Sequence, residues 1–313
     1  MIAQVVRSSA VEAVHEGAIA VANAGGTLLT KQGDVDRIYF MRSVAKPFQA
    51  SVAQELGAAL PPEWLAVACS SHGASPAQVA IVLAMLADAG LGPTDLGCPP
   101  AWPLSEVARS RAWARGHRAP TSIWHNCSGK HAAMLRACVV QGWETATYLS
   151  PTHPLQQAIR DRLSDVTGQN LGVPGVDGCG APVWMASTSG LATAYARLGT
   201  DDQLRPIWTA MHRFAALTAD HPACPVALSR WTETAAKLGA EGLLGIASRR
   251  GFGIVIKAWD GSVRPLGPVA AAALGQLGLV ADGTVGWLET ELEVPVLGGG
   301  DQVGRITATV ELS

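Results

Sequence analysis

The sequence predicts an α+β fold, in which N- and C-terminal strands form a mostly antiparallel sheet and a large helical insertion lies between them. Residues 1–40 read as strands: 11–22 are rich in Val, Ala and Ile with a weak alternation, and turn signals follow at 23–26 and 32–34. Residues 253–259 and 303–312 alternate again, whereas most of the chain between reads as helices. Strands that flank a block of helices are typical of the α+β class.

The helices of the insertion are predicted from end signals and periodicity. Ser75 is a suitable N-cap and Pro76 a suitable first residue for a helix over 76–89. The proline-rich stretch 91–103 and the glycine-rich stretch 168–184 are expected to be irregular. Further helices are expected over about 43–56, 63–69, 128–140, 154–166, 188–198, 204–217, 232–238 and 269–279.

Composition restricts the class of protein. The chain has 313 residues, 48% of them hydrophobic, which is enough for one domain over residues 1–313 with two lobes. The net charge is −2 without a block of like charges, so neither nucleic acid nor membrane is an expected partner. No secretory signal or membrane-length apolar run is visible, and the six cysteines are irregularly spaced. We therefore expect a cytoplasmic protein with reduced thiols.

Ser43 and Lys46 lie three residues apart, which places a hydroxyl and an amine on one face of a helix. Pro47 is tolerated only near a helix start, so Ser43 is expected at a helix N-terminus. There the helix dipole favours a developing negative charge. The pair is a candidate nucleophile beside its own base.

A second segment, residues 125–131, carries two histidines, a thiol, a hydroxyl and an ammonium around one glycine. Few segments with a purely structural role have this composition. The segment is therefore a second candidate for chemistry.

These motifs occur in the order found in the rhizobial-type L-asparaginases, and the chain resembles that family over roughly residues 10–280. The resemblance rests on residues 42–47, 69–72, 125–131 and 177–179, and on Lys257 before Asp260-Gly261. Residues 14–18 and 236–242 are similar as well. The asparagine-cysteine-serine-glycine-lysine-histidine run within 125–131 is the most specific of these signals.

The resemblance implies a fold similar to the serine β-lactamases and penicillin-binding proteins. It implies hydrolysis of L-asparagine to L-aspartate and ammonia by two serine–lysine pairs, Ser43 with Lys46 and Ser71 with Lys257. A lysine acts as a base only when neutral, and its ordinary pKa is about 10.4. Burial and a second cation, expected to be Lys257, would lower that pKa.

The resemblance also implies a zinc site and a homodimer. The zinc ligands map to Cys127, Lys130 and Cys179. Thiolates are suitable zinc ligands, and the metal would keep the lysine deprotonated.

An amino-acid substrate needs charged partners for its two α-groups. Arg42, next to the nucleophile, is a candidate for the carboxylate, and Glu106 for the ammonium. His72, His131 and Asp177 are further candidate contacts. By contrast, a structural ion pair on a helix is expected for two residues four apart, Lys237 and Glu241.

Two alternatives stay open. The first alternative to an L-asparaginase is a related enzyme that acts on glutamine, β-aspartyl amides or β-lactams. The second is a catalytically inactive protein that binds asparagine or zinc. The presence of all four candidate serine and lysine residues argues against the inactive protein.

Overall fold

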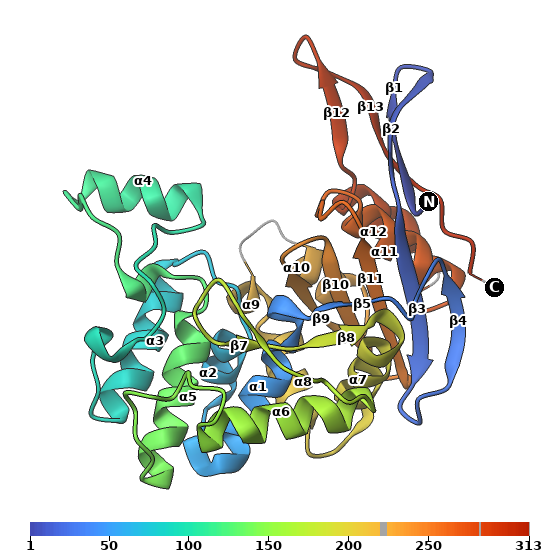
Figure 1. The fold of residues 1–313 in the computed structure, drawn as a ribbon. Coiled ribbons are helices and arrows are strands. Elements are labelled where there is room, and N and C mark those ends of the chain that lie inside the picture. The colour runs from blue at the N-terminus through green and yellow to red at the C-terminus, as the bar shows by residue number, and fades with distance from the viewer. Residues whose placement is uncertain (220–223, 282, 313) are drawn as a thin grey trace.

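A five-stranded antiparallel sheet forms the centre of the molecule (Figure 1). The computed structural model describes residues 1–219, 224–281 and 283–312. Strands from both ends of the chain meet in this sheet, and most helices come between them in sequence, so the predicted α+β class is confirmed. In spatial order the strands are β4 (Leu28–Gln32), β3 (Gly17–Asn23), β11 (Phe252–Ala258), β10 (Leu243–Ser248) and β9 (Thr234–Gly239).

The two faces of the sheet belong to two hydrophobic clusters, because successive strand residues point in opposite directions. On β3, Ala18 and Ala20 belong to the larger cluster, whereas Ile19 and Val21 belong to the smaller one. Helix α7 (Thr188–Thr200) supplies the larger cluster, and α11 (Leu266–Gln276) and α12 (Val285–Glu291) supply the smaller one. The sheet is therefore covered on both faces.

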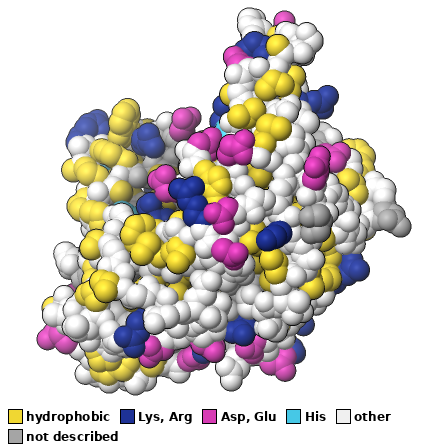
Figure 2. Space-filling view, turned by 45° about the vertical axis from the view of Figure 1, so that its right-hand side comes forward, with side chains coloured by type: hydrophobic (Ala, Val, Ile, Leu, Met, Phe, Trp, Pro, Cys, Tyr) yellow, Lys and Arg dark blue, Asp and Glu magenta, His cyan; other side chains and the backbone are white. Residues whose placement is uncertain are grey.

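The terminal strands divide between two sheets rather than one. Strands near the two ends of the chain form a second, four-stranded sheet, which projects from the body at the top of Figures 1 and 2. The division occurs at Gly17, where a Cβ would lie only 2.2 Å from the Lys257 carbonyl oxygen. The strands of the projecting sheet are, in order, β12 (Pro295–Gly298), β13 (Asp301–Ala308), β1 (Ala3–Arg7) and β2 (Ala10–His15).

Helices make up most of the lobe on the larger cluster. Four short strands form two separate pairs: β5 (Ile38–Phe40) with β8 (Met185–Ser187), and β6 (Gly175–Val176) with β7 (Pro182–Val183). The helices and single turns of this lobe are η1 (Arg42–Ala45), α1 (Lys46–Ala53), η2 (Gln54–Ala58), α2 (Pro62–Ala68), α3 (Pro76–Asp88), η3 (Pro93–Asp95), α4 (Glu106–Ala114), η4 (Ser122–Trp124), α5 (Ser128–Gln141), α6 (Pro154–Thr167), α8 (Arg205–Arg213) and α9 (Ala215–Thr218). Helix α10 (Cys224–Trp231) packs in the smaller cluster instead.

Two helix predictions were wrong in informative ways. The weak helix expected over 232–238 is strand β9 instead, and almost all of the residues of this strand are buried. The helix expected over 204–217 breaks into α8 and α9 at Phe214, which has a non-helical ψ of 39°. Within the described ranges, no helix is both long and apolar enough to cross a membrane.

Candidate active site

Ser43 lies on the single turn η1, which leads directly into α1. The turn packs against the free edge of β9: a Cβ on Gly239 would lie 3.1 Å from Val44 Cγ1. The Tyr195 hydroxyl donates to the Val44 carbonyl at 2.9 Å and holds the turn from the other side. Residues i and i+3 of such a turn lie on one face. The side chains of Ser43, which is partly exposed, and Lys46, which is buried, therefore share a face of the turn.

The Ser71 hydroxyl is the next polar group beyond Lys46. Lys46 Nζ donates to Ser71 Oγ at 3.0 Å and to the Ser70 carbonyl at 2.6 Å. The loop that carries Ser71 is fixed by its backbone, because Ser71 N–H donates to Thr218 O at 3.2 Å. The structure thus brings the predicted Ser43, Lys46 and Ser71 to one place.

Lys237, on β9, is the second lysine at Ser71. Its Nζ lies 3.0 Å from Ser71 Oγ and also donates to the Leu238 carbonyl. The predicted helical ion pair of Lys237 with Glu241 is therefore wrong: the lysine is on a strand, and the carboxylate lies in the following turn near Arg42. A lysine inside the apolar part of the 236–242 motif was the sequence signal for this role.

Lys257 does not reach Ser71, so the predicted Ser71–Lys257 pair is wrong. Its Nζ donates to the carbonyls of Glu241 and Ala258, at 2.6 and 2.7 Å. The physical reason is strand order: Lys257 lies on β11, and β10 separates that strand from β9.

The charges explain how a lysine here can be neutral. Burial, reinforced by the nearby charge of Lys46, holds the pKa of Lys237 well below its ordinary value. Both amines contact one hydroxyl, which accepts from an ammonium and donates to a neutral amine. The arrangement can therefore pass a proton between the two lysines through Ser71. No described residue hydrogen-bonds to Ser43 Oγ, which leaves that hydroxyl available to a ligand.

Arg42 and Asp177 also come together beside Ser43. Arg42 has a φ of +48° and donates from Nε to Asp177 Oδ1 at 2.8 Å. A non-glycine residue in this left-handed region is strained, and such strain concentrates at functional sites. Arg42 Nη1 lies 3.7 Å from the Glu241 carboxylate, a neighbour that the sequence analysis did not place there.

The two predicted histidine contacts are buried in the helical lobe instead. His72 accepts from Ala74 N–H at 3.1 Å, and its other ring nitrogen lies 2.9 Å from Ser128 Oγ. His131 Nδ1 lies 2.5 Å from the Tyr148 hydroxyl. Burial lowers the pKa of His72 to about 3 and that of His131 well below its ordinary value. Both rings are 0% exposed, so direct contact with a substrate, as predicted, does not fit this structure.

Glu106 is exposed at the start of α4, a helix that lies at the upper left of Figure 1. The preceding residue ties this helix to the Ser71 loop, because Ser105 N–H donates to Gly73 O at 3.3 Å. No described charged group pairs with the Glu106 carboxylate. Its role toward a substrate stays a prediction.

Residues 3–308 match the sequence model of a family described as L-asparaginase II. The chain belongs to the L-asparaginase II family. No curated protein matches this family member.

Solved structures similar to this L-asparaginase II family member share little sequence. Mglu in its tris and glutamate form is 16% identical, with a TM-score of 0.48, over 87% of this chain and 62% of Mglu. This chain thus spans less than two thirds of the length of Mglu. A Bacillus glutaminase is 12% identical, with a TM-score of 0.47, over 85% of this chain and 92% of the glutaminase. A provisionally named β-lactamase from Bacteroides dorei is 12% identical, with a TM-score of 0.42, over 77% and 84% of the two chains.

Two thiols and an amine meet next to Asp177, the partner of Arg42, in this family member. Lys130 Nζ donates to Cys179 Sγ at 3.2 Å, and Cys127 lies beside both. A hydrogen bond from the Cys179 thiol lowers the pKa of Cys127, and the same bond raises the pKa of Cys179. All three side chains are buried.

The two thiols fit a zinc ion, because one of them is acidic and lies against the other. Lys130 would have to lose a proton to bind the metal because, against the lowering effect of burial, the nearby thiols raise its pKa. No group of three His, Cys, Asp or Glu side chains suited to a metal occurs in the described part of the chain. The third protein ligand would therefore have to be Lys130.

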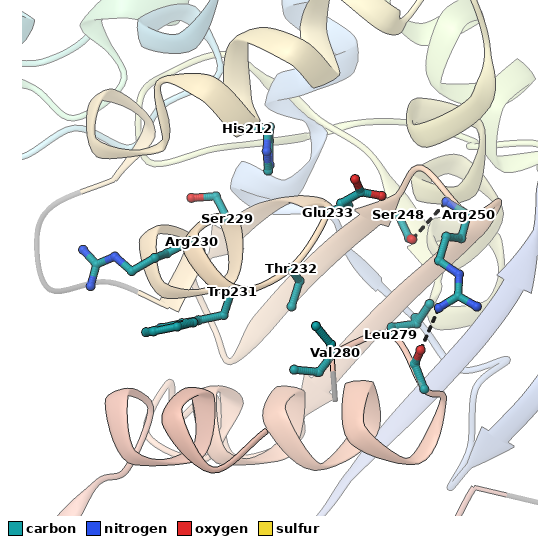
Figure 3. Close-up of a pocket in the computed structure, with 12 residues that line it drawn as sticks. His212, Ser229, Arg230, Trp231, Thr232, Glu233, Ser248, Arg250, Leu279 and Val280 are labelled. Carbon is teal, nitrogen blue, oxygen red and sulfur yellow. Dashed lines mark hydrogen bonds between the residues drawn. The ribbon is translucent and has the colours of Figure 1, made fainter. Parts of the chain in front are cut away.

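A cavity of about 600 Å³ is lined by residues of α10 and by the segment 278–281 that follows α11 (Figure 3). None of Ser43, Lys46, Ser71 and Lys237 lines it. Both arginines and the histidine that line it have protein partners, whereas no described residue pairs with the Glu233 carboxylate. Arg250 Nη1 donates to Gly278 O at 2.6 Å, and Arg230 Nη1 pairs with Glu291 at 2.8 Å. The His212 ring lies 2.8 Å from Thr234 O. Among the described charged side chains of the cavity, Glu233 alone is unpaired, so no set of free charged groups converges there and the site at Ser43 carries the functional argument.

Proposed function

We propose that this chain is an L-asparagine amidohydrolase that works through an acyl-enzyme on Ser43. The observation that carries the proposal is the Ser71 hydroxyl, which lies 3.0 Å from the Nζ atoms of both Lys46 and Lys237, one turn below Ser43. Membership of the L-asparaginase II family supports amide hydrolysis as the reaction class.

Acylation needs a neutral base next to Ser43. With Lys237 neutral, one proton moves from Lys46 through Ser71 to Lys237 and leaves Lys46 neutral. Lys46 then takes the Ser43 proton as Oγ attacks the side-chain carbonyl carbon of asparagine. Such general base catalysis contributes about 10²–10⁴-fold to the rate.

Collapse of the tetrahedral intermediate breaks the C–N bond. Lys46 returns the proton, through Ser71, to the leaving nitrogen, and ammonia departs. Water then repeats the cycle on the ester: it gives its proton to the same lysine, the C–Oγ bond breaks, and Ser43 recovers its hydrogen as aspartate leaves. Protons and atoms balance over the two steps.

The oxyanion needs donors beside Ser43. The Ser43 amide, near the N-terminus of α1, is one candidate, and an amide on the free edge of β9 is the second. The contact between Val44 and Gly239 supports this choice, because it brings η1 against that edge. Loss of one such donor costs about 10²–10³-fold in kcat in comparable enzymes.

Arg42 would bind the α-carboxylate of the substrate. Cys127, Lys130 and Cys179 would hold zinc, which when bound supplies a localised positive charge near the Arg42–Asp177 pair. We include in the proposal a homodimer, which rests on the resemblance alone, and a cytoplasmic location, which rests on the sequence pattern alone.

The test compares Ser43→Ala with Ser9→Ala, a matched change in the exposed turn between β1 and β2. Ammonia release is measured from L-asparagine and, separately, from L-glutamine. Ser43→Ala should lose at least about 10³-fold in kcat, as expected when a nucleophile is removed. Ser9→Ala should match the wild type.

Retention of more than a tenth of the activity by Ser43→Ala would reject the nucleophile. A kcat/KM for L-glutamine equal to or above that for L-asparagine would reject the substrate but keep the reaction class. Mass spectrometry of acid-quenched enzyme should show an aspartyl adduct on the peptide that contains Ser43.

A further inference from the structure

Arg42 has two carboxylate neighbours of different character. Asp177 Oδ1 accepts from Arg42 Nε at 2.8 Å and from Gly178 N–H at 2.9 Å, and its side chain is only 11% exposed. Glu241 lies 3.7 Å from Arg42 Nη1, and its side chain is 68% exposed. Asp177 is therefore held in the wall of the site, whereas Glu241 is loosely paired at its rim.

The two carboxylates beside Arg42 are paired with it unequally. Asp177 lies 2.8 Å from the guanidinium, whereas Glu241 lies 3.7 Å from it. An amino-acid amide brings an α-carboxylate, which suits the guanidinium, and an α-ammonium, which suits the loosely paired carboxylate. Glu241, the more exposed and more weakly paired of the two, is the one free to accept it.

The backbone at Glu241 is held in a conformation that it would not adopt freely. Glu241 has a φ of +61° and Gly242 a φ of +64°, in the turn between β9 and β10. For a residue with a side chain, the left-handed region is strained because Cβ approaches the following carbonyl oxygen. Other contacts must therefore hold the turn in place.

Lys257 supplies those contacts. Its Nζ donates to the Glu241 carbonyl at 2.6 Å, and the next backbone N–H, that of Ala258, donates to the Gly242 carbonyl at 2.8 Å. The ammonium also lies 5.6 Å from the ring centroid of Tyr39, on β5, which leads to Arg42. Lys257 thus joins the turn that carries Glu241 to the strand that carries Arg42 toward Ser43.

We propose that Glu241 is a specificity-determining residue that accepts the α-ammonium of the amino-acid substrate beside Arg42, and that Lys257 is the positioning residue that holds it there. The inference rests on the proposed amidohydrolase function and replaces Glu106 as the ammonium partner. It also gives Lys257 a role that does not require contact with Ser71.

The experiment compares L-asparagine with succinamate, the same amide without the α-ammonium. Glu241→Gln should lower kcat/KM for L-asparagine by about 10–100-fold, the range for a hydrogen bond between charged groups. For succinamate the change should stay within about threefold. Glu63→Gln, an exposed carboxylate at the start of α2, is the matched control and should leave both values unchanged.

Lys257→Met should produce the same selective loss, mainly in KM. Because it acts through Glu241, the double variant should be no worse than Glu241→Gln alone, within about threefold. Lys257→Arg keeps the donors and the charge and should recover most of the discrimination. If Lys257→Met does not fold, Lys257→Arg and Glu241→Gln still decide the question.

Equal losses on both substrates in Glu241→Gln would overturn the inference, since they would show a general structural effect. A selective loss in Glu106→Gln instead would overturn it in favour of Glu106. An active wild type with unchanged discrimination in Glu241→Gln rejects this inference alone. A wild type that hydrolyses neither amide rejects the proposed function, and this inference with it.

Discussion

Two buried lysines on the same sheet have opposite surroundings. Lys237 faces a hydroxyl and a second lysine, and burial holds its pKa well below the ordinary value. Lys257 donates to two carbonyls and lies beside aromatic rings. Of these two lysines, only Lys237 is hydrogen-bonded to a serine in the described part of the chain.

Replacement of Lys237 should therefore slow the chemical step. Lys237→Met is expected to lower kcat by about 10²–10⁴-fold with a smaller change in KM, because it removes a proton acceptor. Steady-state ammonia release provides the measurement, and Lys31→Met on exposed strand β4 is the control. A loss below tenfold would assign the proton transfer to Lys46 without Lys237.

The same pair predicts a pH effect with a definite sign. The Lys46 charge helps to lower the pKa of Lys237, so Lys46→Met should raise that pKa toward its ordinary value. In the wild type, kcat/KM should fall as the pH drops through the lowered pKa, because the neutral amine becomes protonated. Nitrogen-15 NMR of labelled lysine in both proteins measures the shift directly; a Lys237 pKa that stays or falls in Lys46→Met would contradict the assignment.

At the scale of elements, the contact between β11 and α7 determines how the helical lobe meets the sheet. Gly253 has no side chain, and a Cβ there would lie 1.9 Å from Ala192 O and 2.2 Å from Ala196 N. Both are helix backbone atoms, which cannot move aside without displacing the helix. The close approach of α7 thus depends on a glycine at this strand position.

Gly253→Ala is accordingly expected to reduce the free energy of unfolding by about 1–3 kcal/mol, the usual cost of overpacking. Gly286→Ala, on α12, is the matched control because no heavy atom lies within 4 Å of its added Cβ. The control should be neutral or stabilising by up to about 1 kcal/mol, since alanine favours a helix. Urea unfolding of both variants tests this; equal effects would show that the contact does not limit packing.

At the scale of the whole molecule, the site is assembled from segments far apart in sequence. Ser43 and Lys46 come from η1 and α1, Ser71 from the loop after α2, and Lys237 from the edge strand β9. Cys127 and Cys179 meet in the same way, from the start of α5 and the loop between β6 and β7. A ligand that binds both thiols should therefore stabilise the whole fold.

Zinc should raise Tm in the wild type, and Cys127→Ser with Cys179→Ser should abolish both the rise and stoichiometric metal content. A zinc concentration of 100 times Kd corresponds to about 2.7 kcal/mol of stabilisation. Cys224→Ser, on α10, is the control. Differential scanning fluorimetry and elemental analysis give the two readouts; unchanged zinc content in the double variant would refute the site.

Local signals in the sequence determined the fold class and half of the candidate site. Ser75 caps α3 as expected, because caps and periodicity act over one or two helical turns. The Ser43–Lys46 spacing likewise depends on a single turn. The lysine that contacts Ser71 could not be identified in this way, because Lys237 and Lys257 both lie in apolar runs and no local pattern distinguishes them.

Only the tertiary structure decided between these lysines, through the order of β9, β10 and β11 and the packing of η1 against β9. The tertiary structure also buried His72 and His131, whose motif positions pointed to a substrate. The physical reason is range: backbone propensity is set by neighbours in sequence, whereas hydrogen-bond partners and pKa values are set by neighbours in space.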